Sequence, residues 1–219
     1  MTLSKEILFL IRKEFILEFR QKYAISGILL YVLSTVFIVF ASFFQLPKQV
    51  WHTMFWVITL FAAINAIVKS FVQESGSRQL YYYQLVSPHA VLISKMIYNA
   101  LLLLTLSILT WFALGFIAGN PVRDLSLFSG ALCLSALGFS ITLTFVSAIA
   151  AKASNNATLL AILGFPLIIP ILMTLIKLSA NAVGLLSDTA YINDVYILIS
   201  IDMLLLALAI FLFPYLWRD

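Results

Sequence analysis

The chain has 219 residues, of which 63% are hydrophobic and 10% are charged, and its mean hydropathy is +1.08. Soluble domains are usually about 45–50% apolar and about 25% charged, and their surfaces need polar cover that this chain lacks. The composition therefore excludes a soluble enzyme, a disordered tail and a disulfide scaffold, and it predicts an integral membrane protein. The apolar runs are continuous rather than alternating, which favours an all-α protein over a β-barrel.

The net charge of +4 is expected to reflect Lys and Arg at the cytoplasmic face of a membrane, not a nucleic-acid partner. The chain has one cysteine, Cys133. An intrachain disulfide and a thiolate metal cluster are therefore both excluded.

The first 24 residues are predicted to form an interfacial elbow helix that lies on the membrane surface. Leu8, Ile11, Phe15 and Phe19 form an apolar stripe at spacings of three, four and four residues. Basic residues accompany this stripe, as is typical of helices in the headgroup region. No small-residue cleavage site follows the first apolar run, so we do not expect a secretory signal.

Six membrane-spanning helices are expected to follow, all within a single membrane domain (1–219). Each apolar run is long enough to cross a bilayer as a helix. The expected spans are about 25–44, 51–68, 97–118, 125–151, 157–176 and 195–217.

Basic residues are distributed unevenly over the connections. With the N-terminus inside, ten Lys and Arg residues fall on the inner side and three, Lys48, Arg123 and Lys177, on the outer side. Because basic residues concentrate on the cytoplasmic side of membrane proteins, both termini are predicted to be cytoplasmic.

The segment 69–95 (KSFVQESGSRQLYYYQLVSPHAVLISK), between the second and third spans, is the longest polar stretch in the interior of the chain. Gly76 and Ser77 can end one helix and begin another, and Pro88 follows the end of a short helix over 78–86. We expect this short helix to lie on the cytoplasmic face as a coupling helix that docks a partner. The alternative is an interfacial helix with its tyrosines among the headgroups.

These features resemble permeases of the ABC-2 type, and in particular the heme exporter protein B (CcmB) family of cytochrome c maturation. The family has a segment of the type D/E-x-G-S with downstream Leu, Pro and Lys, and a P-L-x-I-P-type stretch in its fifth span. The matching residues here are Glu74, Gly76, Ser77, Leu80, Leu85, Pro88 and Lys95, and the fifth span contains Pro166 and Pro170. The first seven, together with Tyr83 from the same short helix, are the residues expected to couple to the partner.

The resemblance implies a non-catalytic membrane subunit, a homodimer in the bacterial inner membrane that works with two copies of a cytoplasmic ABC ATPase. It implies association with the heme-handling membrane subunit and a role in transferring heme to a periplasmic chaperone. Heme is then a possible cargo, ATP is used by the partner, and the chain itself binds no cofactor. The alternatives are an ABC-2 permease for lipid, polysaccharide or drug, or a membrane scaffold that only assembles other subunits.

Missing motifs agree with this interpretation. The sequence contains no G-x-x-x-x-G-K-[ST] loop for nucleotide phosphates and no C-x-x-C-H site for covalent heme.

His52, at the outer edge of the second span, could reach a heme iron, although a polar interfacial role is favoured. His89 is expected at the inner surface.

Asp202 is the charged residue deepest in an expected span. An ionised aspartate there costs about 2.5–3.5 kcal/mol on insertion scales, so Asp202 should face protein or water, or be protonated. With Asn65 it is a candidate intramembrane polar residue, either on a pathway or interface or in a structural hydrogen bond.

Pro166 and Pro170 are predicted to kink the fifth span, as a fixed bend or as a hinge.

Overall fold

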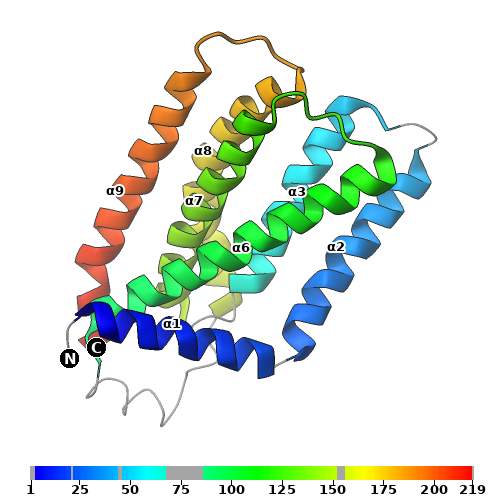
Figure 1. The fold of residues 1–219 in the computed structure, drawn as a ribbon. Helices are drawn as coiled ribbons and strands as arrows, with labels where there is room; N and C mark the ends of the chain where they lie inside the picture. The colour runs from blue at the N-terminus through cyan, green and yellow to red at the C-terminus, as the bar shows by residue number, and fades with distance from the viewer. Residues whose placement is uncertain (1–2, 21, 44–45, 68–85, 152–155, 219) are drawn as a thin grey trace.

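The computed structural model describes residues 3–20, 22–43, 46–67, 86–151 and 156–218, and every regular element in these ranges is an α-helix (Figure 1). The helices are α1 (Leu3–Arg20), α2 (Lys22–Ser42), α3 (Lys48–Ile67), α6 (Pro88–Ala118), α7 (Leu125–Ala151), α8 (Asn156–Val183) and α9 (Tyr191–Arg218). Five of them, α3 and α6 to α9, are long and apolar enough to cross a membrane, and α2 contains a shorter apolar stretch, Ser26–Ser42. The prediction of an all-helical membrane protein is confirmed, with five to six spans.

The central helix of the bundle is α7, which packs against α3, α6, α8 and α9. Its most apolar stretch is 78% buried, against 22% for that of α9. Small residues such as Gly138, Ser140 and Thr144 recur along α7, and small side chains allow neighbouring helix backbones to approach closely. Three described hydrogen bonds reinforce this approach: Ser140 Oγ donates to the Met96 carbonyl (2.6 Å), Asn99 Nδ2 to Thr144 Oγ1 (2.8 Å) and Ser147 Oγ to the Ile67 carbonyl (3.5 Å).

Several helices extend beyond the apolar runs that predicted them. Helix α6 begins at Pro88, the first helical position, where proline's fixed φ fits and its missing N–H costs nothing. Helix α8 continues to Val183, so Lys177 is helical and the expected loop 177–194 shortens to 184–190.

The end of α8 depends on a glycine in the left-handed region. Gly184 has a φ of 74°, and its N–H donates to the Asn181 carbonyl (3.1 Å) while that of Leu185 donates to the Ala180 carbonyl (2.9 Å). This pair of bonds satisfies carbonyls that the helix end leaves open. A Cβ at Gly184 would lie 2.9 Å from Arg123 Cδ, so the turn also packs against the loop between α6 and α7.

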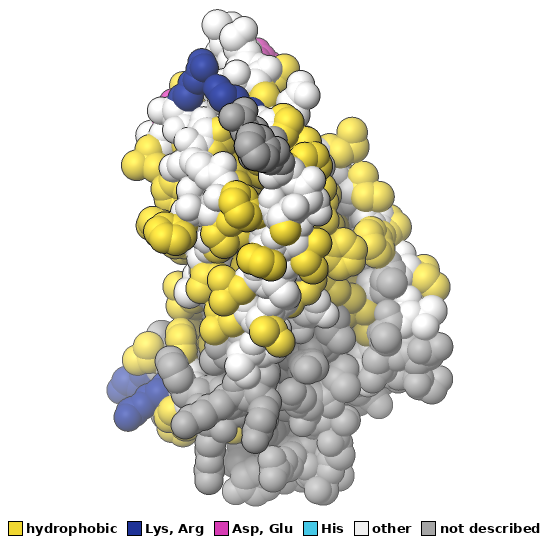
Figure 2. All heavy atoms as spheres, turned by 90° about the vertical axis from the view of Figure 1, so that its right-hand side faces the viewer, with side chains coloured by type: hydrophobic (Ala, Val, Ile, Leu, Met, Phe, Trp, Pro, Cys, Tyr) yellow, Lys and Arg dark blue, Asp and Glu magenta, His cyan; other side chains and the backbone are white. Residues whose placement is uncertain are grey.

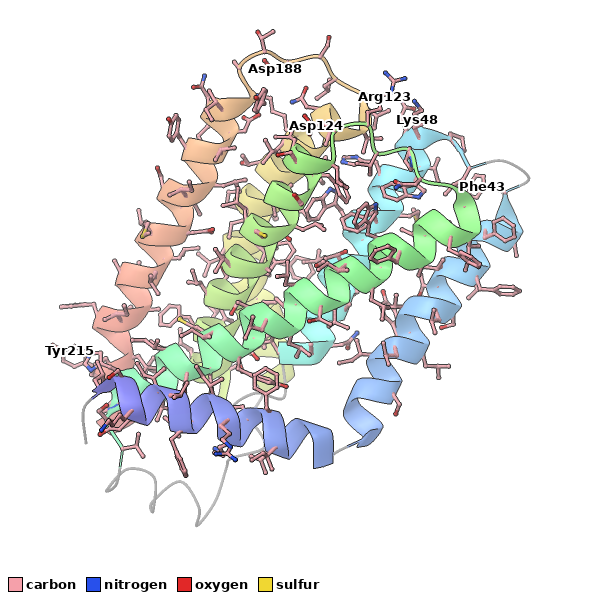
Figure 3. All side chains as sticks on the ribbon, in the orientation of Figure 1. Phe43, Lys48, Arg123, Asp124, Asp188 and Tyr215 are labelled. Atoms are coloured by element: carbon pink, nitrogen blue, oxygen red, sulfur yellow. The ribbon has the colours of Figure 1, made fainter. Side chains whose placement is uncertain are left out.

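Several charged side chains lie at one end of the bundle. Lys48, Arg123 and Asp188 are found there, and the aromatic residue Tyr215 marks the opposite end (Figure 3). Figure 2 shows Lys and Arg side chains at the top and lower left of one face, with apolar side chains between them. Lys177 Nζ pairs with Asp188 Oδ2 (3.3 Å), so the three basic residues expected on the outer side lie at one end. The start of α1 and the end of α9 lie at the opposite end (Figure 1).

This arrangement predicts the labelling of cysteines introduced into a variant whose Cys133 is replaced by Ala. Lys48→Cys and Arg123→Cys should react with a membrane-impermeant maleimide from the outside of intact cells. Lys152→Cys, which lies outside the described residues, should react only after the inner face is exposed. Labelling of Lys48→Cys and Lys152→Cys from the same side would contradict the six-span arrangement with an inner N-terminus.

Candidate functional site

The candidate site is the end of the bundle where α1 crosses the start of α6. The chain between Ile67 of α3 and Val86 reaches α6 at this end. Six of the residues expected to couple to a partner lie in this connection, outside the described residues: Glu74, Gly76, Ser77, Leu80, Tyr83 and Leu85. Pro88 and Lys95 lie in the first turns of α6.

Among the described residues, three side-chain contacts join α1 to the start of α6. Ser87 Oγ donates to Glu6 Oε2 (3.1 Å), Lys95 Nζ pairs with Glu14 Oε1 (3.4 Å), and the rings of Phe15 and Tyr98 meet edge to face with centroids 5.1 Å apart. We call these six residues the α1–α6 strap.

The strap has a regular geometry. Glu6 and Glu14 are eight residues apart, as are Ser87 and Lys95. The two helices therefore run in the same direction, side by side, over about 12 Å. Because the strap begins at Ser87, a displacement of the connection before it acts on both α6 and α1.

Lys95, one of the residues expected to couple to the partner, does not face outward. Its side chain is 2% exposed, and its ammonium group lies against Glu14. A buried ammonium is stable only with an opposite charge or hydrogen bonds around it. Lys95 is therefore placed to position α1.

Ser87 is the N-cap residue of α6, but its hydroxyl makes no capping hydrogen bond. It is bonded to Glu6 instead. Pro88 has no N–H group, so the start of α6 has one fewer backbone donor that needs a capping partner. The Ser87 side chain thus ties the start of α6 to α1, while the Ser87 carbonyl accepts from the N–H groups of Ala90 (3.0 Å) and Val91 (3.3 Å).

His52 lies inside the bundle, where it joins α3 to α8. It is 4% exposed, and its Nε2 is 2.8 Å from Ser179 Oγ. Trp56 Nε1 also donates to Ser179 Oγ (2.8 Å), and that hydroxyl donates to the Leu175 carbonyl (2.6 Å). The imidazole is therefore buried between α3 and α8, with Ser179 as a hydrogen-bond partner. Its position relative to the membrane interface and its reach to a heme iron stay predictions. His89 is half-buried in the first turn of α6, beside Tyr215 of α9.

Outside the spans, the loop before α9 contains an ionised group with a clear electrostatic environment. The N–H of Ala190 donates to Asp188 Oδ1 (2.8 Å), and Lys177 Nζ is 3.3 Å from Asp188 Oδ2. The hydrogen bond from Ala190, followed by that from Lys177, lowers the pKa of Asp188 below its ordinary value. The carboxylate therefore stays charged and holds the loop against α8.

The two candidate intramembrane polar residues lie in different environments. Asp202 is 7% exposed and lies against Gly138 of α7, so it faces protein. Asn65 is exposed near the end of α3, and it is not a hydrogen-bond partner of Asp202 Oδ1, which has none.

Pro166 and Pro170 both lie inside α8, which continues through them, and both are exposed. Neither can donate a backbone hydrogen bond to the preceding turn. The bend and its role as a hinge stay predictions.

Sequence reasoning missed Glu6, Glu14, Ser87, Tyr98 and Gly138. Glu6 and Glu14 carried a signal, because they are acidic residues in an otherwise largely apolar helix and lie eight residues apart. Gly138 carried no signal, because the sequence does not distinguish it from Gly130 on the same helix. In the structure the two differ: a Cβ added at Gly130 would meet nothing within 4 Å, whereas one at Gly138 would meet Asp202.

The strap predicts the effect of charge reversal. Lys95→Glu should separate α1 from α6, because it puts a carboxylate against Glu14. Adding Glu14→Lys should restore the contact at least in part, through the reversed pair. The readout is cross-linking by a short bis-maleimide between cysteines introduced at Glu6 and Ser87.

Arg12→Glu is the matched control, because Arg12 is an exposed basic residue of the same helix. It should leave the cross-linking yield unchanged. Equal yields for Lys95→Glu and the control would show that the pair does not hold α1.

Comparison with known proteins gives one family. The CcmB protein family matches residues 5–218, nearly the whole chain. The comparison with curated proteins gave no significant match. The family match agrees with the helical membrane fold and with the resemblance in the segment before α6. The chain belongs to the CcmB family, a family of ABC transporter permeases for heme and cytochrome c biogenesis.

Proposed function

We propose that the chain is the permease subunit of an ABC complex that serves cytochrome c maturation in the bacterial inner membrane. In this proposal a cytoplasmic ATPase hydrolyses ATP. The permease couples that hydrolysis to heme export or to release of the heme-loaded periplasmic chaperone. A homodimer of the chain works with two ATPase copies and with the heme-handling membrane subunit.

The observation that carries the proposal, together with the family, is the position of the α1–α6 strap. The connection that contains Glu74 to Leu85 leads to Val86, one residue before the strap begins at Ser87 and two before α6 begins at Pro88. A partner that pushes on this connection therefore acts at once on α6 and α1. Helix α6 packs against α7, so the push reaches the centre of the bundle.

Leu80, Tyr83 and Leu85 supply the apolar surface for docking in this proposal. Burial of one such side chain stabilises a contact by about 1.5–3 kcal/mol, and about 1.4 kcal/mol is a tenfold change in affinity. Glu74 pairs with a basic residue at the rim of the partner and sets its orientation. Gly76 permits the sharp turn before the helix.

Leu80→Asp is expected to abolish copurification of the ATPase while the permease still reaches the membrane. The change removes an apolar contact and places a charge in the docking surface. Gly76→Val should weaken binding through strain in the turn, by about 1–2 kcal/mol if the glycine has positive φ. Copurification from solubilised membranes and the yield of mature cytochrome c are the two readouts.

Tyr82→Asp is the matched control, because two residues turn a helix by about 200° and put this change on the opposite face. It should leave the ATPase bound. If Leu80→Asp and Gly76→Val both left ATPase binding and cytochrome c maturation intact, the docking proposal would be rejected. If the chain binds the ATPase but removing this complex leaves cytochrome c maturation unchanged, the result would favour another cargo. No ATPase bound to the wild-type chain would favour the scaffold.

A further inference from the structure

A carboxyl group is inserted between three helices deep in the bundle. Asp202 Oδ1 of α9 lies so close to α7 that a Cβ on Gly138 would be 2.7 Å from it. The same Cβ would be 3.2 Å from Ile171 Cγ2 of α8. Only glycine leaves room for the carboxyl here, and we call Gly138, Ile171 and Asp202 the Gly138 notch.

The carboxyl has neither a hydrogen bond at Oδ1 nor a counter-ion among the described residues. Asp202 is 7% exposed, and its buried Oδ1 has no hydrogen-bond partner. The neighbouring helix α7 contains no charged residue and no histidine. An ionised carboxylate in this position would lose the hydration of its Oδ1 without a hydrogen bond in exchange.

The charged and histidine side chains on the other helices packed against α9 are engaged elsewhere or lie near its ends. On α8 the single one is Lys177, whose Nζ is 3.0 Å from Asp194 Oδ1 in the first turn of α9. On α6 they are His89, beside the last turns of α9, and Lys95, paired with Glu14. None of these described pairs involves Asp202.

We propose that Asp202 is a proton-binding site whose occupancy is linked to the contact between α7 and α9. While the Gly138 notch is closed, the group is a neutral carboxylic acid. When α9 moves away from α7, water reaches the carboxyl, the O–H bond breaks, and the proton passes to water while the electron pair stays on the carboxylate. Closing reverses the step, with the proton taken from hydronium.

This linkage fixes the direction of pH dependence. The closed contact binds one more proton than the open one, so lower pH favours closing and higher pH favours opening. The site is independent of the proposed ATPase docking, because it involves the contact between α7 and α9 and not the segment before α6. A failure of one proposal therefore leaves the other standing.

Infrared spectroscopy of the full chain in lipid nanodiscs tests the proton directly. The chain has five aspartates, and aspartate labelled with ¹³C at the side-chain carboxyl alone separates their bands from those of glutamate and of the C-terminal carboxyl, which belongs to Asp219. We expect one protonated aspartate per chain at neutral pH, visible as a carboxylic acid C=O band that is lost in Asp202→Asn. The wild-type spectrum is decisive even if the variant does not fold. Carboxylate bands alone at neutral pH would overturn the proposal.

Two glycines of α7 test the link to helix contact. Gly138→Ala should push α9 away and reduce the protonated band, whereas Gly130→Ala should not, because its Cβ meets nothing within 4 Å. In the Gly138→Ala variant, a second substitution, Asp202→Ser, should restore the lost thermal stability, because the shorter side chain lacks the carboxyl oxygen Oδ1 that clashes with the new Cβ. If Gly138→Ala matches Gly130→Ala in both band and thermal stability, the linkage is wrong.

Discussion

In a bilayer, an apolar side chain gains little by leaving lipid for a neighbouring helix, so close backbone approach and hydrogen bonds between helices must hold a bundle together. Helix α7 meets this requirement for α3, α6, α8 and α9. Its small residues let four helices pack against it, and the bond from Asn99 to Thr144 joins it to α6. The carboxyl of Asp202 fits beside α7 only because Gly138 has no side chain.

At one end of the bundle, the α1–α6 strap joins α1 to α6, and through α6 to the central helix α7. Helix α1 packs mainly against α6, with Leu10 buried in the core, and its strap contacts fall on one stretch of α6. Helix α6 in turn packs against α7. A force applied before Ser87 therefore has a continuous packed route to the centre, and α1 moves with it. This route is the structural basis of the coupling proposed for the chain.

Most of the helices could be predicted from the sequence, because an uncharged run of about 20 residues has few alternatives to a membrane-crossing helix. The helix ends were harder, since Gly184 and Pro88 act through local backbone geometry beyond the apolar runs. The burial of Asp202 could be foreseen from its depth, but its placement against Gly138 could not. Lys95 was expected at the membrane edge, yet its pairing with Glu14 joins residues 81 positions apart, which no local pattern encodes.

The central claim is that α1 and the start of α6 move together when the ATPase closes. Pulsed electron paramagnetic resonance on the purified complex measures this with spin labels at three sites: Leu8 on α1, Ile97 on α6 and Arg123 at the far end, all exposed. With a non-hydrolysable ATP analogue, the account predicts an unchanged distance between Leu8 and Ile97 and a shifted distance between Leu8 and Arg123. A change in the first distance, or no change in the second, would contradict it.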